Sequence, residues 1–143
     1  MISPLKLPAL SLFLFALLMF TGVSAQTSGE YYNKAYEAYN KKDYNTCVYY
    51  GKKAIELNSS NYDAYGLVGD AYYYLADYQK AVENYSSALR SSSFTSKTQA
   101  YYYYRRGKAK DKLGDYDGAI TDYTSCISKY ASEYSGSAYW ERG

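Results

Sequence analysis

Along most of the chain, apolar and small residues recur at steps of three or four positions, which is the spacing of one face of an α-helix. Tyr65, Gly69 and Tyr72 fall on one such face, and a second stripe begins at Ala81 and ends at Leu89. A short polar turn separates the two stripes. β-Strands would instead alternate apolar and polar side chains with a period of two. The pattern therefore predicts pairs of amphipathic helices.

The same pair of stripes occurs three times. An Asp-Tyr pair follows each predicted turn, and its aspartate recurs at a nearly constant interval, as Asp43, Asp77 and Asp115. An aromatic residue stands at the same distance before each of these aspartates, at Tyr31, Tyr65 and Tyr103. Aspartate after a turn can cap the second helix by accepting backbone N–H bonds. Because one helix pair cannot bury its apolar stripe alone, we expect the three copies to stack and share a continuous core.

The N-terminal segment, residues 1–25, has a different composition. A single charge, Lys6, precedes a largely apolar run from Ala9 to Phe20, and small residues suit cleavage before Gln26. This is the three-part pattern of a secretory signal peptide. A membrane anchor is the alternative, but a spanning helix needs about 20 apolar residues, and this run is much shorter. We therefore expect residues 1–25 to be a signal peptide, and the mature chain to be exported to a periplasmic or extracellular location without a stable membrane span.

The three copies resemble the tetratricopeptide repeat. The second copy carries the marks of that motif most completely, at Tyr65, Gly69, Tyr72, Tyr78, Ala81, Tyr85 and Ala88. The first and third copies depart from it, since Cys47 and Cys126 stand where alanine is usual. The resemblance implies an all-α fold, a right-handed α-solenoid of antiparallel helix-turn-helix repeats. The predicted repeats are residues 28–61, 62–95 and 100–133, and residues 136–143 match the start of a truncated fourth.

Tyrosine occurs 23 times, and four tyrosines are consecutive from Tyr101 to Tyr104. Consecutive residues of a helix point in different directions, so such a helix must be contacted on several sides. Tyr103 matches the aromatic residue that packs between the two helices of its own repeat, and we expect Tyr102 to pack toward the preceding repeat. Tyr101 and Tyr104 fall on the remaining face, which in this family lines a concave groove where partners bind.

The resemblance implies that eleven residues line this groove. They are Tyr32, Tyr36, Tyr39, Asp70, Tyr73, Tyr74, Tyr101, Tyr104, Arg105, Lys108 and Asp111. Tyrosine is a rigid, amphipathic side chain that is frequent in recognition surfaces. We therefore expect a non-enzymatic interaction module or scaffold that binds a partner peptide or protein. One branch of the family binds C-terminal carboxylates with a lysine, asparagine and arginine clamp, but only Arg105 matches that clamp here.

Three other interpretations remain open at this stage. The groove tyrosines could be ordinary surface aromatics that bind no partner. The chain could be the N-terminal segment of a longer envelope enzyme or sensor protein. The groove could also bind a glycan, because tyrosine rings stack on sugars as well as on peptides.

Composition excludes several kinds of chemistry. The chain has no histidine, which removes the commonest general base and the commonest metal ligand. The net charge is +2 with both signs scattered along the chain, so no basic stripe indicates binding of nucleic acid. Cys47 and Cys126 lie two repeats apart at core positions, and we expect two buried thiols instead of a disulfide. No cofactor, metal site or catalytic residue is predicted.

Overall fold

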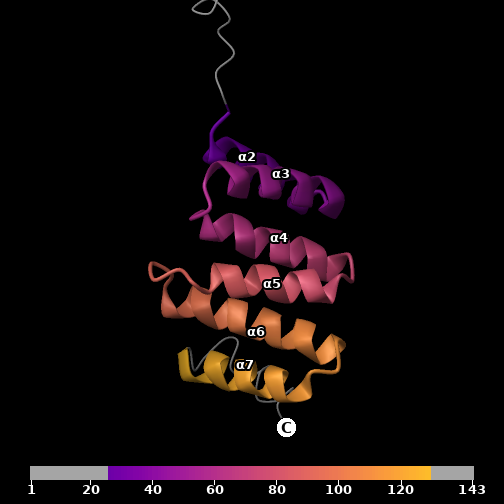
Figure 1. Ribbon diagram of the computed structural model, residues 1–143, viewed down its shortest axis with the longest axis vertical. Coiled ribbons are helices and arrows are strands. Elements are labelled where there is room, and N and C mark those ends of the chain that lie inside the picture. The colour runs from indigo at the N-terminus through magenta and orange to yellow at the C-terminus, as the bar shows by residue number, and fades with distance from the viewer. Residues whose placement is uncertain (1–25, 130–143) are drawn as a thin grey trace, which may run out of the picture.

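The structure is a computed structural model, and it describes residues 26–129. All regular secondary structure in this part of the chain is helical, as Figure 1 shows. The helices are α2 (Ser28–Asn40), α3 (Tyr44–Leu57), α4 (Tyr62–Tyr74), α5 (Tyr78–Ala88), α6 (Ser96–Lys112) and α7 (Tyr116–Lys129). The predicted signal peptide, the end of the third repeat and the predicted fourth repeat lie outside the described residues.

The helices form three antiparallel hairpins, which are α2–α3, α4–α5 and α6–α7. Figure 1 shows these helices stacked in chain order along the longest axis of the molecule. Helix α3 packs on α4 and α5 packs on α6, so each hairpin contacts the next. The first helices of the hairpins also meet directly, α2 with α4 and α4 with α6. The predicted all-α stack of helical hairpins is confirmed.

The turn inside each hairpin forms as the sequence predicts. Backbone N–H groups of the second helix donate to the capping aspartates: Thr46 to Asp43 Oδ1 at 3.1 Å, Lys80 to Asp77 Oδ1 at 3.3 Å, and Gly118 to Asp115 Oδ1 at 3.0 Å. The residue before each aspartate takes a positive φ, 60° at Lys42, 60° at Ala76 and 79° at Gly114. Glycine accepts this left-handed conformation at the least cost, and only the third turn uses it.

Helix α6 begins at Ser96, ahead of the predicted start of the third repeat at residue 100. Thr95 is the reason, because its Oγ1 accepts the backbone N–H of Thr98 at 3.2 Å and caps the helix there. Asn61 caps α4 in the same way, with Oδ1 accepting the N–H of Ala64 at 3.0 Å.

The core is continuous from one hairpin to the next. In the first cluster, Ala35 and Cys47 of the first hairpin pack with Leu67 of α4. In the second cluster, Tyr102 of α6 packs with Ala81, Tyr85 and Ala88 of the preceding hairpin. The predicted position of Tyr102 is therefore confirmed. Partly buried tyrosines complete the clusters, with Tyr65 against the second and Tyr103 against the third, as expected for aromatic residues between the helices of their own hairpins.

Small residues allow the helices to approach closely. A Cβ atom on Gly69 would lie 2.8 Å from Cδ1 of Tyr85, and one on Gly107 would lie 2.6 Å from Cε1 of Tyr123. Cys47 and Cys126 are free and buried, so the prediction of two core thiols is confirmed. Among the described helices, none is both long enough and apolar enough to cross a bilayer.

Candidate functional site

The eleven predicted groove residues all lie on α2, α4 and α6, and we call them the candidate face. Contacts of α2 with α4 and of α4 with α6 bring these three helices together on one side of the stack. Tyr32, Tyr36 and Tyr39 come from α2, and Asp70, Tyr73 and Tyr74 come from α4. The remaining five come from α6, namely Tyr101, Tyr104, Arg105, Lys108 and Asp111.

Asp70 lies at the centre of the candidate face and is only 7% exposed. Its carboxylate accepts three hydrogen bonds: from the Tyr85 hydroxyl at 2.7 Å, from the Tyr101 hydroxyl at 2.8 Å and from Arg105 Nε at 2.9 Å. These bonds connect α4 with α5 and with α6. A buried carboxylate requires such partners, because removing an unpaired charge from water is costly. Asp70 therefore holds neighbouring hairpins together beneath the face.

Arg105 continues this network toward the surface. Its Nε also donates to the Tyr85 hydroxyl at 3.2 Å, and its guanidinium lies over the ring of Tyr73, 4.5 Å from the centroid. The Tyr74 ring is 5.2 Å away and the Tyr101 ring 6.0 Å away. Within residues 26–129, the buried Nη2 atom of Arg105 has no hydrogen-bond acceptor. One buried donor of the network is thus held in place without an acceptor among the described residues.

The tyrosine hydroxyls of this network stay protonated at neutral pH. Burial raises the pKa of Tyr85 and of Tyr101, and the negative charge of Asp70 raises both further. Burial likewise raises the pKa of Tyr39, again with a contribution from Asp70. These three phenols are therefore hydrogen-bond donors at neutral pH.

An aromatic contact joins α2 to the network. The rings of Tyr39 and Tyr74 lie 6.1 Å apart. Six of the predicted residues are in this way connected by direct contacts, namely Tyr39, Asp70, Tyr73, Tyr74, Tyr101 and Arg105.

The other five predicted residues lie around this network. Tyr32 and Tyr36 stack on each other along α2 at 6.4 Å. Lys108 lies over the ring of Tyr104, which in turn packs against the core cluster of its own hairpin. Asp111 is exposed near the end of α6. Tyr36 and Tyr74 present the most aromatic surface on this face, each being 50% exposed.

Sequence reasoning missed three members of the network, Tyr44, Tyr78 and Tyr85, which all belong to the second helices of the hairpins. Tyr44 stacks on Tyr74, with ring centroids 4.8 Å apart and planes 10° apart. Tyr78 meets Tyr73 edge to face at 5.5 Å. Tyr44 and Tyr78 are the tyrosines of the Asp-Tyr pairs, so the repeat pattern already singled them out. The assumption that only first helices reach the face left them unassigned.

The candidate face combines phenol hydroxyls, aromatic rings and two cations, Arg105 and Lys108, and Asp70 partly balances the charge of Arg105. Within residues 26–129, no group of three or more His, Cys, Asp or Glu side chains is arranged to hold a metal ion.

Comparison with known proteins identifies the hairpins. Residues 62–94 and 100–128 match the family model of the tetratricopeptide repeat. A search of curated proteins finds no significant match to the sequence. Similarity to solved structures indicates the fold of the described residues. The chain is similar to the Arabidopsis OM64 TPR domain, with 25% identity and a TM-score of 0.71, over 80% of this chain and 90% of that one.

Two further similar structures contain bound peptides. The first TPR of Spaghetti (RPAP3), bound to the HSP90 peptide SRMEEVD, is 18% identical with a TM-score of 0.72, over 85% of this chain and 92% of that one. PcrH, in complex with the chaperone binding region of PopD, is 17% identical with a TM-score of 0.72, over 87% of this chain and 94% of that one. The second and third hairpins therefore match the model of the tetratricopeptide repeat, and the described chain is similar in fold to solved tetratricopeptide domains.

Proposed function

We propose that the chain is an exported protein-interaction module that binds a peptide segment of a partner along the candidate face. The observation that carries the proposal is the network of Tyr39, Asp70, Tyr73, Tyr74, Tyr101 and Arg105. It fixes aromatic rings and hydroxyls from three helices in one surface before any partner arrives. A surface that is ordered in advance loses less entropy on binding than a mobile one.

The same fold supports peptide binding in other proteins. The RPAP3 repeat binds an HSP90 peptide, and PcrH binds a region of PopD. In this chain, the half-exposed rings of Tyr36 and Tyr74 would supply apolar contact area for the partner. Because Asp70 already balances the charge of Arg105, a neutral segment suits the face better than an acidic tail.

Capture experiments with matched variants test the binding surface. The chain from Gln26 onward is immobilised and incubated with an envelope fraction of its own cells, and retained proteins are identified by mass spectrometry. In the test variant, Tyr36→Ala and Tyr74→Ala remove the two most exposed rings of the face. In the control variant, Tyr49→Ala and Tyr116→Ala remove rings that are 58% and 65% exposed on α3 and α7.

A partner of the candidate face should be retained by the wild type and by the control variant, and should be lost from the test variant while its helical circular dichroism is unchanged. Equal retention by both variants would show that partners bind elsewhere. Export has a separate test, in which the N-terminus of the mature protein is sequenced. A first residue at Gln26 supports the proposed leader, and a retained Met1 contradicts it.

A further inference from the structure

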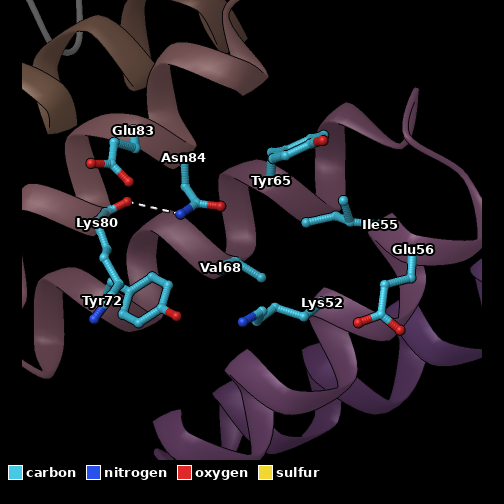
Figure 2. A pocket seen from close by; sticks show the side chains of 9 residues that line it. All are labelled: Lys52, Ile55, Glu56, Tyr65, Val68, Tyr72, Lys80, Glu83 and Asn84. Carbon is cyan, nitrogen blue, oxygen red and sulfur yellow. Dashed lines mark hydrogen bonds between the residues drawn. The ribbon is translucent and has the colours of Figure 1, made fainter.

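A hollow that shares no residue with the candidate face lies between α3, α4 and α5, as Figure 2 shows. Its volume is about 310 Å³, which is at the small end of ligand-binding pockets and suits a single ring with one or two polar groups. Val68 lies at its centre, with Tyr65 and Ile55 on one side and Tyr72 on the other. Its wall is thus largely apolar and aromatic.

The repeat explains why this hollow is open. When the second and third copies are aligned on Asp77 and Asp115, Arg106 takes the place of Val68, and it fills the equivalent junction. Its Nε donates to Asp122 at 2.8 Å, its Nη2 donates to the same carboxylate at 2.6 Å, and its Nη1 donates to Ser86 Oγ at 2.9 Å. Val68 is too short to make such a bridge, and Asn84 stands in place of Asp122.

The wall of the hollow carries two lysines and two glutamates, and one of the glutamates, Glu83, accepts a hydrogen bond from Gln79 Nε2 at 3.1 Å. Glu56 is paired with Lys53 at 3.0 Å, and Lys80 is paired with Asp77. Lys52 is the remaining lysine of the wall, and it makes no ion pair within residues 26–129. In Figure 2 its ammonium extends beneath Val68 toward Tyr72.

Both tyrosine rings of the wall already carry a cation. Lys80 lies 5.3 Å from the centroid of Tyr72, and Arg90 lies 5.9 Å from that of Tyr65. A cationic ligand on these rings would meet Lys80 and Arg90, and the two carboxylates of the wall already have partners, Glu56 in Lys53 and Glu83 in Gln79. A carboxylate, by contrast, would provide Lys52 with an ion-pair partner.

Asn84 offers a hydrogen-bond acceptor to a ligand in the hollow, in addition to the aromatic wall and the ammonium of Lys52. Its Nδ2 donates to the backbone carbonyl of Lys80 at 2.8 Å, which fixes the side-chain amide and leaves Oδ1 as an acceptor. Figure 2 shows this oxygen on the side of the amide that faces Tyr65, so a ligand in the hollow could donate an N–H to it.

We propose that the hollow binds an aromatic carboxylate of amino-acid size. The carboxylate pairs with Lys52, the ring lies on Val68 between Tyr65 and Tyr72, and an N–H donates to Asn84 Oδ1. An N-acylated aromatic amino acid and the C-terminal aromatic residue of a polypeptide share this chemistry. The site lies apart from the candidate face and does not depend on the function proposed for that face.

The test uses N-acetyl-L-phenylalanine as the probe and the full-length chain as the receptor, with binding followed by isothermal titration calorimetry. Its amide, N-acetyl-L-phenylalaninamide, keeps the ring and the N–H but lacks the charge. N-acetyl-L-arginine amide tests a cationic occupant instead. We expect the carboxylate to bind at least about tenfold more tightly than either amide, as the loss of one ion pair in a partly enclosed site implies. A tetrapeptide with a free C-terminal phenylalanine then shows whether a chain terminus is accepted.

Two neighbouring lysines provide a matched pair of variants. Lys52→Gln should weaken binding of the carboxylate about tenfold, whereas Lys53→Gln removes an equal charge that is paired with Glu56 and should leave it unchanged. Both lysines are on α3, and thermal unfolding checks that each variant is folded. Equal effects of the two variants, equal affinity for acid and amide, preference for the arginine probe, or absence of binding would each overturn the proposal.

Discussion

Asp70 is the residue on which most polar contacts of the candidate face depend. It is a charged side chain inside a helical bundle, with one arginine and two phenol hydroxyls as partners. Removing one partner from such a cluster would leave desolvated charges unpaired, at a cost to stability. The same contacts orient Tyr101 and Arg105, so packing and recognition share one carboxylate.

Replacing Asp70 with alanine should therefore be severe. Arg105 would keep its buried charge without a counterion, and Tyr85 and Tyr101 would lose their acceptor, so we expect the free energy of unfolding to fall by about 3–5 kcal/mol. Urea denaturation followed by circular dichroism measures this change. Asp111→Ala is the control, since Asp111 is exposed on the same face and its loss should change stability by less than about 0.5 kcal/mol. Similar values for both variants would show that the buried ion pair has no structural role.

The sequence could not predict this cluster. Asp70 stands far ahead of Tyr85, and still further ahead of Tyr101 and Arg105, along the chain. These residues come into contact only when one hairpin packs on the next, and no pattern of neighbouring residues specifies that packing. The pattern of α4 correctly placed Asp70 near Tyr73 and Tyr74, but it gave no sign that its carboxylate is buried. Arg105 was selected because of the family resemblance alone.

At the scale of the helices, prediction from sequence was far more complete. Turns, helix caps and close helix contacts each depend on residue types a few positions apart. The chain repeats the same residue pattern three times, so these features could be predicted. Gly66 is an exception, because the hydroxyl of Tyr102 lies where its Cβ would be, at 2.0 Å. The motif does not mark Gly66, since this contact depends on the unusual tyrosine at position 102.

Glycines inside the helices should respond in opposite ways to the same substitution. In Gly69→Ala, the new Cβ would meet the Tyr85 ring at 2.8 Å, and the forced shift should cost about 1–3 kcal/mol of stability. In Gly29→Ala, the nearest atom is Thr27 Oγ1 at 3.9 Å, and the smaller entropy of the unfolded chain should stabilise α2 by about 0.5 kcal/mol. Thermal unfolding measures the change in stability of each variant. A Gly69→Ala variant that is more stable than the wild type would contradict the close approach of α4 and α5.

For the molecule as a whole, the buried thiols and phenols set the response to alkaline pH. Burial raises the pKa of Cys47 from 9.0 to about 12, with contributions from Asp70 and Asp43, and burial raises that of Cys126 to about 11. The folded chain holds these protons more tightly than the unfolded chain does. Unfolding therefore releases protons above about pH 9, and stability is full below this pH and falls as the pH rises toward 12.

Urea midpoints measured across that range should decline, and the decline should be smaller in Cys47→Ala, which lacks one of the titrating groups. Tyr85 and Tyr101 act in the same direction, since their pKa values are also raised by burial, so part of the decline should remain in the variant. Midpoints independent of pH over this interval would mean that the thiols and phenols ionise freely in the folded protein.

The two junctions between hairpins differ in charge, because within residues 26–129 an ion pair crosses only the second. The second and third hairpins are joined by Asp70 with Arg105 and by Arg106 with Ser86, which are directional bonds between partly or fully buried groups. Between the first and second hairpins, the rings of Tyr44 and Tyr74 stack, and Asn61 donates to Ser28.

In a linear array, hairpins open at the junction that costs least to separate, and we expect this to be the junction that no ion pair crosses within residues 26–129. Amide protons of α2 and α3 should therefore exchange with deuterated water sooner than those of α4, α5 and α6. A solenoid with unequal junctions would unravel from its amino-terminal end while the Asp70 cluster and most of the surface around it remained folded.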